Sequence, residues 1–140
     1  MNLLQLSNSI NNSIKTSIDK YLDKDRLKFD FKKKFSLEDR KYQSERIMKK
    51  YPNRIPVICN VSIKLPALDK HKYLIPDNMN STDFFFILRK RLKLNENKAM
   101  YFFVKDKTLI PNILMSRVYN KYQDEDGFLY IFACSENTFG

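Results

Sequence analysis

Glycine is almost missing from this chain: of its 140 residues, only Gly127 and Gly140 are glycines. Phosphate-binding loops and dinucleotide fingerprints need several glycines at fixed spacing, so the sequence excludes both kinds of nucleotide site. Long apolar runs are also missing, because no stretch reaches the 18 or so apolar residues that a transmembrane helix needs. The N-terminus has no hydrophobic region of a secretory signal. We therefore expect a cytoplasmic protein unless an attachment carries it to a membrane.

Histidine and cysteine are scarce, and His71, Cys59 and Cys134 are the only examples. They cannot supply the usual zinc ligand sets, and His71 stands in a basic run, which favours a solvated side chain over a catalytic base. We expect no metal site, no cofactor and no enzymatic activity. Both cysteines fall in apolar stretches, which predicts free thiols in strands and a reducing compartment.

Positive charge is in excess, with 26 Lys and Arg against 16 Asp and Glu, a net charge of +10. Residues 32–54 alone hold nine basic and three acidic residues. Such a patch can attract acidic peptides, anionic lipid heads, acidic protein tails or nucleic acid. Electrostatic steering of acidic peptides is the preferred interpretation, and an ordinary solvated helix face is the alternative.

The first 30 residues differ in character from the rest, since they are rich in Ser and Asn and their charges nearly cancel. Apolar residues recur there at steps of three and four, a weakly amphipathic helical pattern: Leu3, Leu6, Ile10, Ile14, Ile18, Tyr21 and Leu22. We interpret residues 1–30 as an N-terminal extension that is mobile or helical, with a partner or membrane-surface helix as the sharper alternative. Residues 31–134 would form the domain and residues 135–140 a flexible tail.

Beyond the extension, the pattern predicts first a helix and then two strands. Ser36, with Asp39 three residues later, has capping-box spacing and begins a helix that ends before Pro52. Residues 56–64 alternate as in a half-buried strand, and those on the apolar face are Val57, Cys59, Val61 and Ile63. Residues 72–75 predict a second, short strand closed by a proline.

The second half of the chain predicts a helix, a strand, a short helix and a strand. Asn80 or Ser81 caps the helix, and the apolar run at residues 99–104 predicts a strand buried on both faces. A short helical segment follows at 114–122 and a final strand at 128–134. This order is typical of a ubiquitin-like β-grasp domain, an α+β fold in which the first and last strands lie side by side in the sheet.

Several blocks of the sequence resemble the autophagy ubiquitin-like modifiers of the GABARAP type. These blocks are KKYPNRIPVI at residues 49–58, LDKHKYLIP at 68–76, FFFILRKR at 84–91, DEDGFLYI at 124–131, and the final Phe-Gly pair at 139–140. The resemblance runs from about residue 31 to residue 140. It implies a ubiquitin-like β-grasp fold with two additional N-terminal helices.

The resemblance also implies conjugation through the C-terminal Gly140 to phosphatidylethanolamine. Activating and conjugating enzymes of the autophagy cascade would attach the lipid, and a cysteine protease would process or delipidate the protein. The modifier would then recruit cargo receptors and adaptors to autophagosomal or related membranes. A residue without a Cβ suits passage of the tail through a narrow enzyme channel.

Partners of this family carry aromatic-x-x-aliphatic motifs that bind as an extra strand along the edge at residues 72–75. The resemblance implies a first docking pocket formed by Ile47, Pro56, Lys72, Leu74 and Phe128. It implies a second formed by Tyr73, Ile75, Pro76, Met79, Phe84 and Ile87, of which Phe84 and Ile87 are equally explained as core. A flank for acidic residues of the partner would consist of Lys49, Lys50, Arg54 and Arg91.

The sequence departs from GABARAP-type chains in several places. The connection between the first two strands is about two residues shorter, Gln43 stands where those chains have an acidic residue, and no residue follows Gly140. Whether Gly140 is the encoded or a processed end stays open.

Two other functions compete with conjugation. The first is a non-conjugated β-grasp adaptor that only binds peptides. The second is a nucleic-acid-binding domain, but the chain lacks the aromatic motif of RNA-recognition domains, so we expect no specific nucleic-acid partner.

Overall fold

The computed structural model describes residues 29–94 and 98–135. The expectations for the N-terminal extension before residue 29 and for Gly140 therefore lie outside the described residues. The helices are α2 (Asp30–Lys34), α3 (Leu37–Lys50), α4 (Ser81–Leu92) and α5 (Met115–Tyr122). The strands are β1 (Arg54–Val61), β2 (Lys72–Pro76), β3 (Met100–Val104), β4 (Lys107–Thr108) and β5 (Leu129–Ser135). The order predicted from residue 36 onward is confirmed, and the two-residue β4 is an addition to it.

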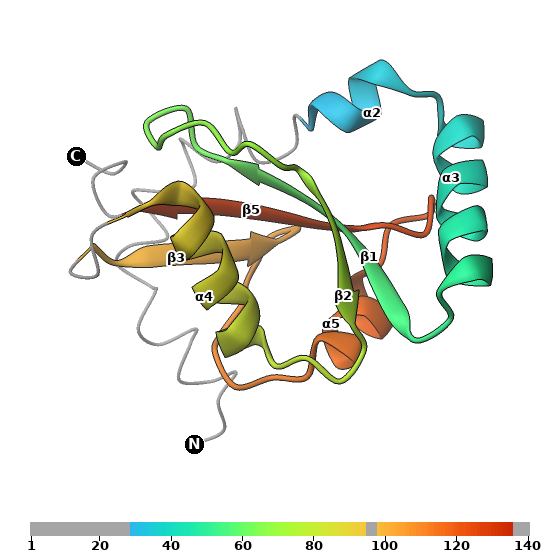
Figure 1. The fold of residues 1–140 in the computed structure, drawn as a ribbon. Helices are drawn as coiled ribbons and strands as arrows, with labels where there is room; N and C mark the ends of the chain where they lie inside the picture. Colours follow the sequence, from blue (N-terminus) through green and yellow to red (C-terminus); the bar gives the residue numbers. More distant parts are fainter. Residues whose placement is uncertain (1–28, 95–97, 136–140) are drawn as a thin grey trace.

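The strands form one mixed sheet in the order β2-β1-β5-β3-β4. β1 and β5 pair in parallel, with Val57 opposite Leu129, and the other neighbours are antiparallel. The prediction that the first and last strands lie side by side is therefore confirmed. With α2 and α3 before the sheet, the fold is the expected α+β β-grasp with two N-terminal helices (Figure 1).

The sheet separates two hydrophobic cores, because successive side chains of a strand point to opposite faces. We call the first core the cluster against α4 and α5, whose members include Val57, Phe84, Leu88, Met115, Val118, Leu129 and Ile131. We call the second core the cluster on the side of α2 and α3, formed by Phe29, Ile58, Phe103, Phe128, Tyr130, Phe132 and Cys134. β5 contributes alternate residues to each core, and all seven of its residues are buried.

The helix ends follow from local side-chain chemistry. The Ser36 hydroxyl accepts a hydrogen bond from the Asp39 backbone N–H at 3.1 Å, and α3 ends just before Tyr51 and Pro52. The Asn80 side-chain oxygen accepts from the Thr82 N–H at 3.0 Å and caps α4. Both predicted helix starts are therefore confirmed.

The predicted strand at residues 56–64 is wrong at its end, because β1 stops at Val61. Ser62 begins a turn in which its carbonyl accepts from the Leu65 N–H at 2.9 Å. The turn breaks the alternation, so that Ser62 is buried and Ile63 is 83% exposed rather than on the apolar face.

Two further expectations from the sequence have mixed outcomes. The strand expected to be buried on both faces is buried only from Phe102 onward, because Met100 and Tyr101 lie at the end of the sheet. Cys59 and Cys134 lie buried in β1 and β5 and are not joined in a disulfide, as predicted. No helix in the described part of the chain is long and apolar enough to cross a membrane.

Candidate functional site

The candidate site lies along β2, the strand at one edge of the sheet. β2 pairs with β1 on its inner side, with Pro56 opposite Leu74 and Ile58 opposite Lys72. Tyr73 and Ile75 are buried, whereas Lys72 is exposed and Leu74 is half-buried. The predicted alternation along this strand is therefore confirmed, and the outer edge of β2 has no neighbouring strand in the described sheet.

A cavity of about 240 Å³ opens beside β2 and is bordered by all five residues predicted for the first docking pocket: Ile47, Pro56, Lys72, Leu74 and Phe128. Val57, Lys70 and Tyr73 complete its lining. We call this cavity the edge pocket. Its residues come from α3, β1, β2 and the segments just before β2 and β5, so only the folded domain brings them together.

The apolar side of the edge pocket is built on aromatic packing. Phe128 is 1% exposed, and its ring packs edge-to-face on Phe31 of α2, with centroids 5.0 Å apart. Ile47 packs on the same second core from α3. These contacts fix the floor of the pocket before any ligand arrives.

The polar side of the edge pocket is cationic. The Lys72 ammonium donates a hydrogen bond to the Gln43 side-chain oxygen at 2.9 Å and lies 4.9 Å from the centroid of the Phe31 ring. Partial burial lowers the pKa of Lys72, and repulsion from Lys34 lowers it further. Because Gln43 is neutral, it leaves the positive charge of Lys72 uncompensated at this contact.

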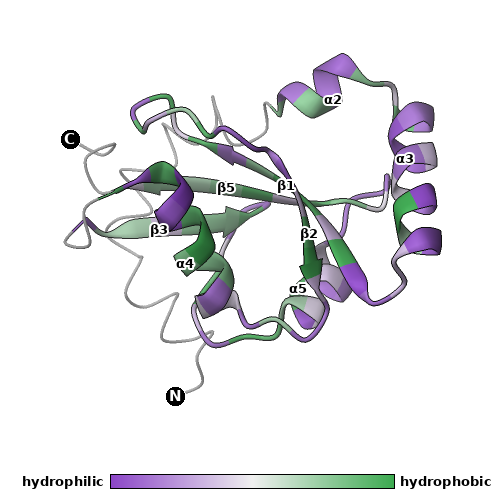
Figure 2. Cartoon of the chain, in the orientation of Figure 1, coloured by the Kyte–Doolittle hydropathy of each residue, from purple (hydrophilic) through white to green (hydrophobic). Residues whose placement is uncertain are grey.

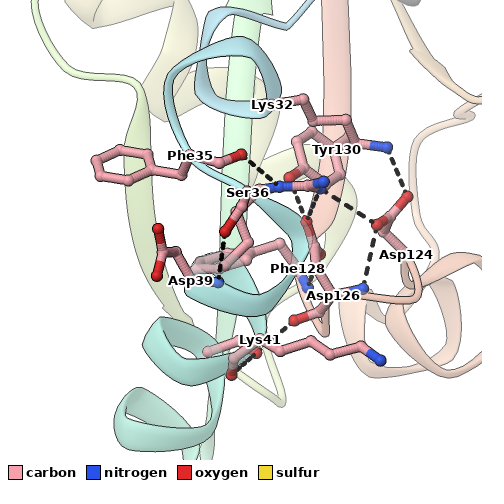
Figure 3. Close-up of polar contacts among 11 residues, drawn as sticks. Lys32, Phe35, Ser36, Asp39, Lys41, Asp124, Asp126, Phe128 and Tyr130 are labelled. Carbon is pink, nitrogen blue, oxygen red and sulfur yellow. Dashed lines mark hydrogen bonds and ion pairs between the residues drawn. The ribbon is translucent and has the colours of Figure 1, made fainter.

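A buried polar network ties α3 to the sheet and so fixes the position of Ile47. The Asp126 carboxylate, with its side chain fully buried, accepts from the Arg40 guanidinium at 2.7 Å, from the Phe128 N–H at 2.8 Å and from the Tyr130 hydroxyl at 2.5 Å (Figure 3). On the next turn of α3, the Ser44 hydroxyl donates to the Asp126 carbonyl. These bonds satisfy a charge whose burial alone would be costly.

Gly127 lets α3 approach this network closely. Its φ is +89°, a conformation that favours glycine. A Cβ at this position would lie only 2.5 Å from the Ser44 hydroxyl oxygen. The glycine is therefore required both by the turn before β5 and by the contact with α3.

The residues predicted for the second docking pocket lie mostly within the first core. Tyr73, Ile75 and Phe84 are 7%, 4% and 0% exposed, whereas Met79 and Ile87 pack partly buried against them and Pro76 is half-buried. The Tyr73 hydroxyl is buried without a hydrogen-bond partner among the described residues, and burial raises its pKa to about 12. For Phe84, the alternative of a core position fits its complete burial.

The four predicted flank cations are all exposed, but they are not equivalent. Arg91 pairs with both oxygens of Asp69 at 3.1 Å, and Arg54 donates to the Leu74 carbonyl at 3.3 Å. Lys49 and Lys50 end α3. Arg54 is thus the flank residue bonded directly to the edge strand.

Sequence reasoning missed two lining residues of the edge pocket, Lys70 and Val57, and also missed Phe31, which packs on the lining residue Phe128. Phe31 and Lys70 come from segments predicted only as an extension boundary and a turn, and Val57 was predicted as core. The position of Phe31 directly before three lysines was its only distinctive feature in the sequence.

His71 is exposed, and its Nδ1 lies 3.0 Å from the Cys59 carbonyl. No metal-binding group of His, Cys, Asp or Glu occurs within the described residues.

Comparisons with known proteins identify the family of the chain. Residues 39–140 match the model of the family described as autophagy protein Atg8 ubiquitin like. The chain is 49% identical over 117 residues to autophagy-related protein 8 of Kluyveromyces lactis, covering 81% of this chain and 94% of that protein.

Two solved structures share the fold. Trypanosoma brucei ATG8 superposes with a TM-score of 0.76 at 32% identity, covering 81% of this chain and 99% of that one. Plasmodium falciparum Atg8, solved in complex with a P. falciparum Atg3 peptide, superposes with a TM-score of 0.68 at 34% identity, covering 75% and 97%. By its sequence and its fold, the chain belongs to the Atg8 family of autophagy-related ubiquitin-like proteins.

Proposed function

We propose that this protein is a ubiquitin-like modifier that is conjugated through Gly140 to phosphatidylethanolamine and that recruits peptide-bearing partners through the edge pocket. The observation that carries the second part is the cavity of about 240 Å³ beside an edge strand, bordered by Ile47, Pro56, Lys72, Leu74 and Phe128. An extended peptide that pairs with β2 gains main-chain hydrogen bonds, and its side chains at alternate positions can enter pockets. The Plasmodium relative solved with an Atg3 peptide supports peptide binding as a property of this fold.

In the proposed recognition, one bulky side chain of an aromatic-x-x-aliphatic motif enters the edge pocket. The other would pack against the rim formed by Pro76, Met79 and Ile87, which keep part of their surface exposed. Acidic residues flanking the motif would be attracted by Lys72 and by the exposed flank cations Lys49, Lys50, Arg54 and Arg91. Because these charges are exposed, we expect peptide affinity to fall as the salt concentration rises.

The proposed conjugation needs no catalytic group from this chain. An activating enzyme would form an adenylate on the Gly140 carboxyl group at the expense of ATP, and a cysteine of the conjugating enzyme would then carry it as a thioester. The amine of phosphatidylethanolamine attacks the thioester carbonyl, the C–N amide bond forms, the C–S bond breaks, and the amine proton leaves with the released thiol. The lipid-linked protein would reside on autophagosomal or related membranes, and a cysteine protease would release it by hydrolysis of the amide.

The peptide site is tested with the double variant Ile47→Ala, Leu74→Ala, since both residues are half-buried and border the pocket. A labelled aromatic-x-x-aliphatic peptide should bind about 30-fold more weakly, which corresponds to about 2 kcal/mol. The matched control is Ile63→Ala, Phe86→Ala, two exposed apolar residues outside the edge pocket. Undiminished affinity in a folded double variant would refute the site.

Conjugation is tested by Gly140→Ala in the full chain. We expect loss of both the lipid-shifted band and membrane association in cells, with peptide binding retained. Survival of the lipid-shifted band would refute conjugation through Gly140. Mass spectrometry of the cellular C-terminus would show whether the wild-type protein carries the lipid, and its absence under autophagy-inducing conditions would favour the non-conjugated adaptor.

A further inference from the structure

A second and larger cavity, of about 580 Å³, lies at the opposite edge of the sheet from β2. It is bounded by β4, the loop that follows it and α5, and we call it the α5 groove. In Figure 1, this part of the chain is the orange segment that leads from β3 to α5. The α5 groove shares no lining residue with the edge pocket. It is therefore a separate feature that the proposed function does not use.

The floor of the α5 groove is apolar. Its apolar lining consists of Val104, Leu109, Ile110, Ile113, Leu114 and Val118. Val104, Leu109 and Val118 belong to the first core and are at most 7% exposed, whereas Leu114 is 42% exposed although it is a large hydrophobic residue. The groove thus offers an apolar surface that is continuous with the core and open to solvent.

The wall of the groove is held in place by the start of α4. The Ser81 hydroxyl donates to the Ile110 carbonyl at 2.8 Å and accepts from the Ile113 N–H at 3.1 Å. The Asn112 N–H donates to the Thr82 hydroxyl at 2.9 Å, and Asn112 adopts a φ of +65°. A wall bonded in this way loses little conformational freedom when a ligand binds.

The rim of the groove is cationic. Lys107, Arg117 and Lys121 line it and are exposed, and none of the lining residues is acidic. A partner that carries carboxylates beside an apolar side chain would match both the rim and the floor. A flat lipid surface would meet the cations but could not fill a concave groove, and a nucleic-acid backbone would leave the apolar floor unused.

From the apolar floor, the preformed wall and the cationic rim, we propose that the α5 groove is a second docking site, which binds an acidic segment of a partner protein through one bulky apolar side chain. The partner's aliphatic or aromatic side chain contacts Leu114 and Val118, and its carboxylates pair with Arg117 and Lys121. Since the two sites occupy opposite edges of the sheet, one partner with two motifs could bind both at once and gain affinity from the linkage.

The test uses the full chain and fluorescein-labelled peptides of about 12 residues, built from Asp, Glu and Ser around one central Phe. We expect saturable binding by fluorescence anisotropy and amide shifts of Leu114 and Val118 in NMR spectra. Replacing the Phe by Ser should weaken binding about tenfold, because the floor then loses its apolar contact.

The deciding variant is Arg117→Glu, Lys121→Glu, and the matched control is Lys33→Glu, Lys90→Glu, which changes the net charge by the same amount at exposed positions outside the groove. The groove variant should bind the Phe peptide at least about tenfold more weakly, and the control variant less than about threefold. Leu114→Ala supplies an uncharged second variant, which should reduce affinity for the Phe peptide but not for the Ser peptide. Unfolding midpoints within error of the wild type show that the variants remain folded.

The proposal is overturned if the Phe peptide shows no saturable binding, or if the groove and control variants lose equal affinity for it. It is also overturned if Ile47→Ala, Leu74→Ala loses binding of this peptide instead. A groove variant that loses binding to vesicles of anionic lipid but keeps binding to the Phe peptide would overturn it as well. Concentration-dependent dimerisation that Arg117→Glu, Lys121→Glu abolishes would identify a second copy of the chain as the occupant and would also overturn it. The aromatic-x-x-aliphatic peptide should bind the groove variant normally. Failure of the α5 groove is therefore distinguishable from failure of the edge pocket.

Discussion

The two faces of the sheet are covered by different kinds of contact. The face toward α4 and α5 packs through the first core, in which side chains such as Phe84, Leu88 and Met115 are fully buried. The face toward α2 and α3 packs through the second core together with a buried ion pair between Arg40 and Asp126. Figure 2 shows the contrast, since α4 is largely green whereas purple dominates α3.

The difference indicates how each layer is held. Apolar packing is non-directional and spreads its stabilisation over many contacts. A buried ion pair places much of the stabilisation in one contact, because removal of one partner leaves the other charged and desolvated. We infer that α4 is secured by many replaceable contacts and α3 by a few irreplaceable ones.

The largest effect is expected for Asp126→Ala, which tests whether α3 depends on the buried ion pair more than α4 does. It removes the closer carboxylate of the largely buried Arg40 guanidinium, which keeps only Asp124 at 3.8 Å. It also removes the acceptor of the Phe128 N–H and the Tyr130 hydroxyl. We expect the free energy of unfolding to fall by about 3–5 kcal/mol. Urea denaturation measures the total, and hydrogen exchange should show a larger loss of protection in α3 than in α4. Equal losses in the two helices would contradict the inference.

The counterpart on the other face is Leu88→Ala. Leu88 is 0% exposed in α4, and truncation of such a residue leaves a cavity that costs about 3 kcal/mol. Because the first core also includes β1 and β5, hydrogen exchange should report loss of protection in α4 and throughout the sheet. The control is Phe86→Ala on the exposed side of α4, for which we expect a change below about 0.5 kcal/mol.

The smallest expected effect concerns Lys32 of α2, which donates to Asp124 at 2.7 Å. Burial raises the pKa of Asp124, but the hydrogen bonds from Lys32 and from the Asp126 backbone lower it more, so that it lies below its ordinary value. A carboxyl with a lower pKa in the folded state stabilises the fold above its unfolded pKa, and this contribution disappears as the pH falls through the folded pKa.

Lys32→Met should therefore cost about 0.5–1 kcal/mol at pH 7 and less at about pH 3. Urea unfolding of both proteins across this pH range measures the difference. A cost that stays constant with pH would show that Lys32 acts through packing on Tyr130, whose ring centroid lies 4.6 Å from its ammonium, rather than through Asp124.

The fold was accessible from the sequence where local chemistry decides it. The hydroxyl of Ser36 and the amide of Asn80 marked the helix starts. Alternation marked β1 and β2, and an apolar run marked β5. The end of β1 was not accessible, because the turn at Ser62 depends on hydrogen bonds rather than on hydropathy. β4 has only two residues, too few for any periodicity to indicate a strand.

The site was accessible mainly through the family resemblance. All five residues of the first predicted pocket surround one cavity, although they are far apart in the sequence and their hydropathy alone does not connect them. The buried pair of Arg40 and Asp126 could not be predicted from the sequence. A charged residue in an amphipathic helix or a turn is normally expected to be exposed to solvent. The α5 groove was also unforeseen, because it arises from the way the loop before α5 is bonded to α4.

The parallel pairing of β1 with β5 also governs how the domain folds. The strands at the centre of the sheet are among the most distant elements in the described chain, with Val57 opposite Leu129. Long-range contacts require closure of a large loop before they stabilise anything, and domains rich in them fold slowly. During synthesis β1, β2 and α4 emerge from the ribosome well before β5. Their apolar faces therefore stay exposed until β5 pairs with β1. The nascent domain therefore passes through an interval in which it is prone to aggregation and is a natural client for chaperones.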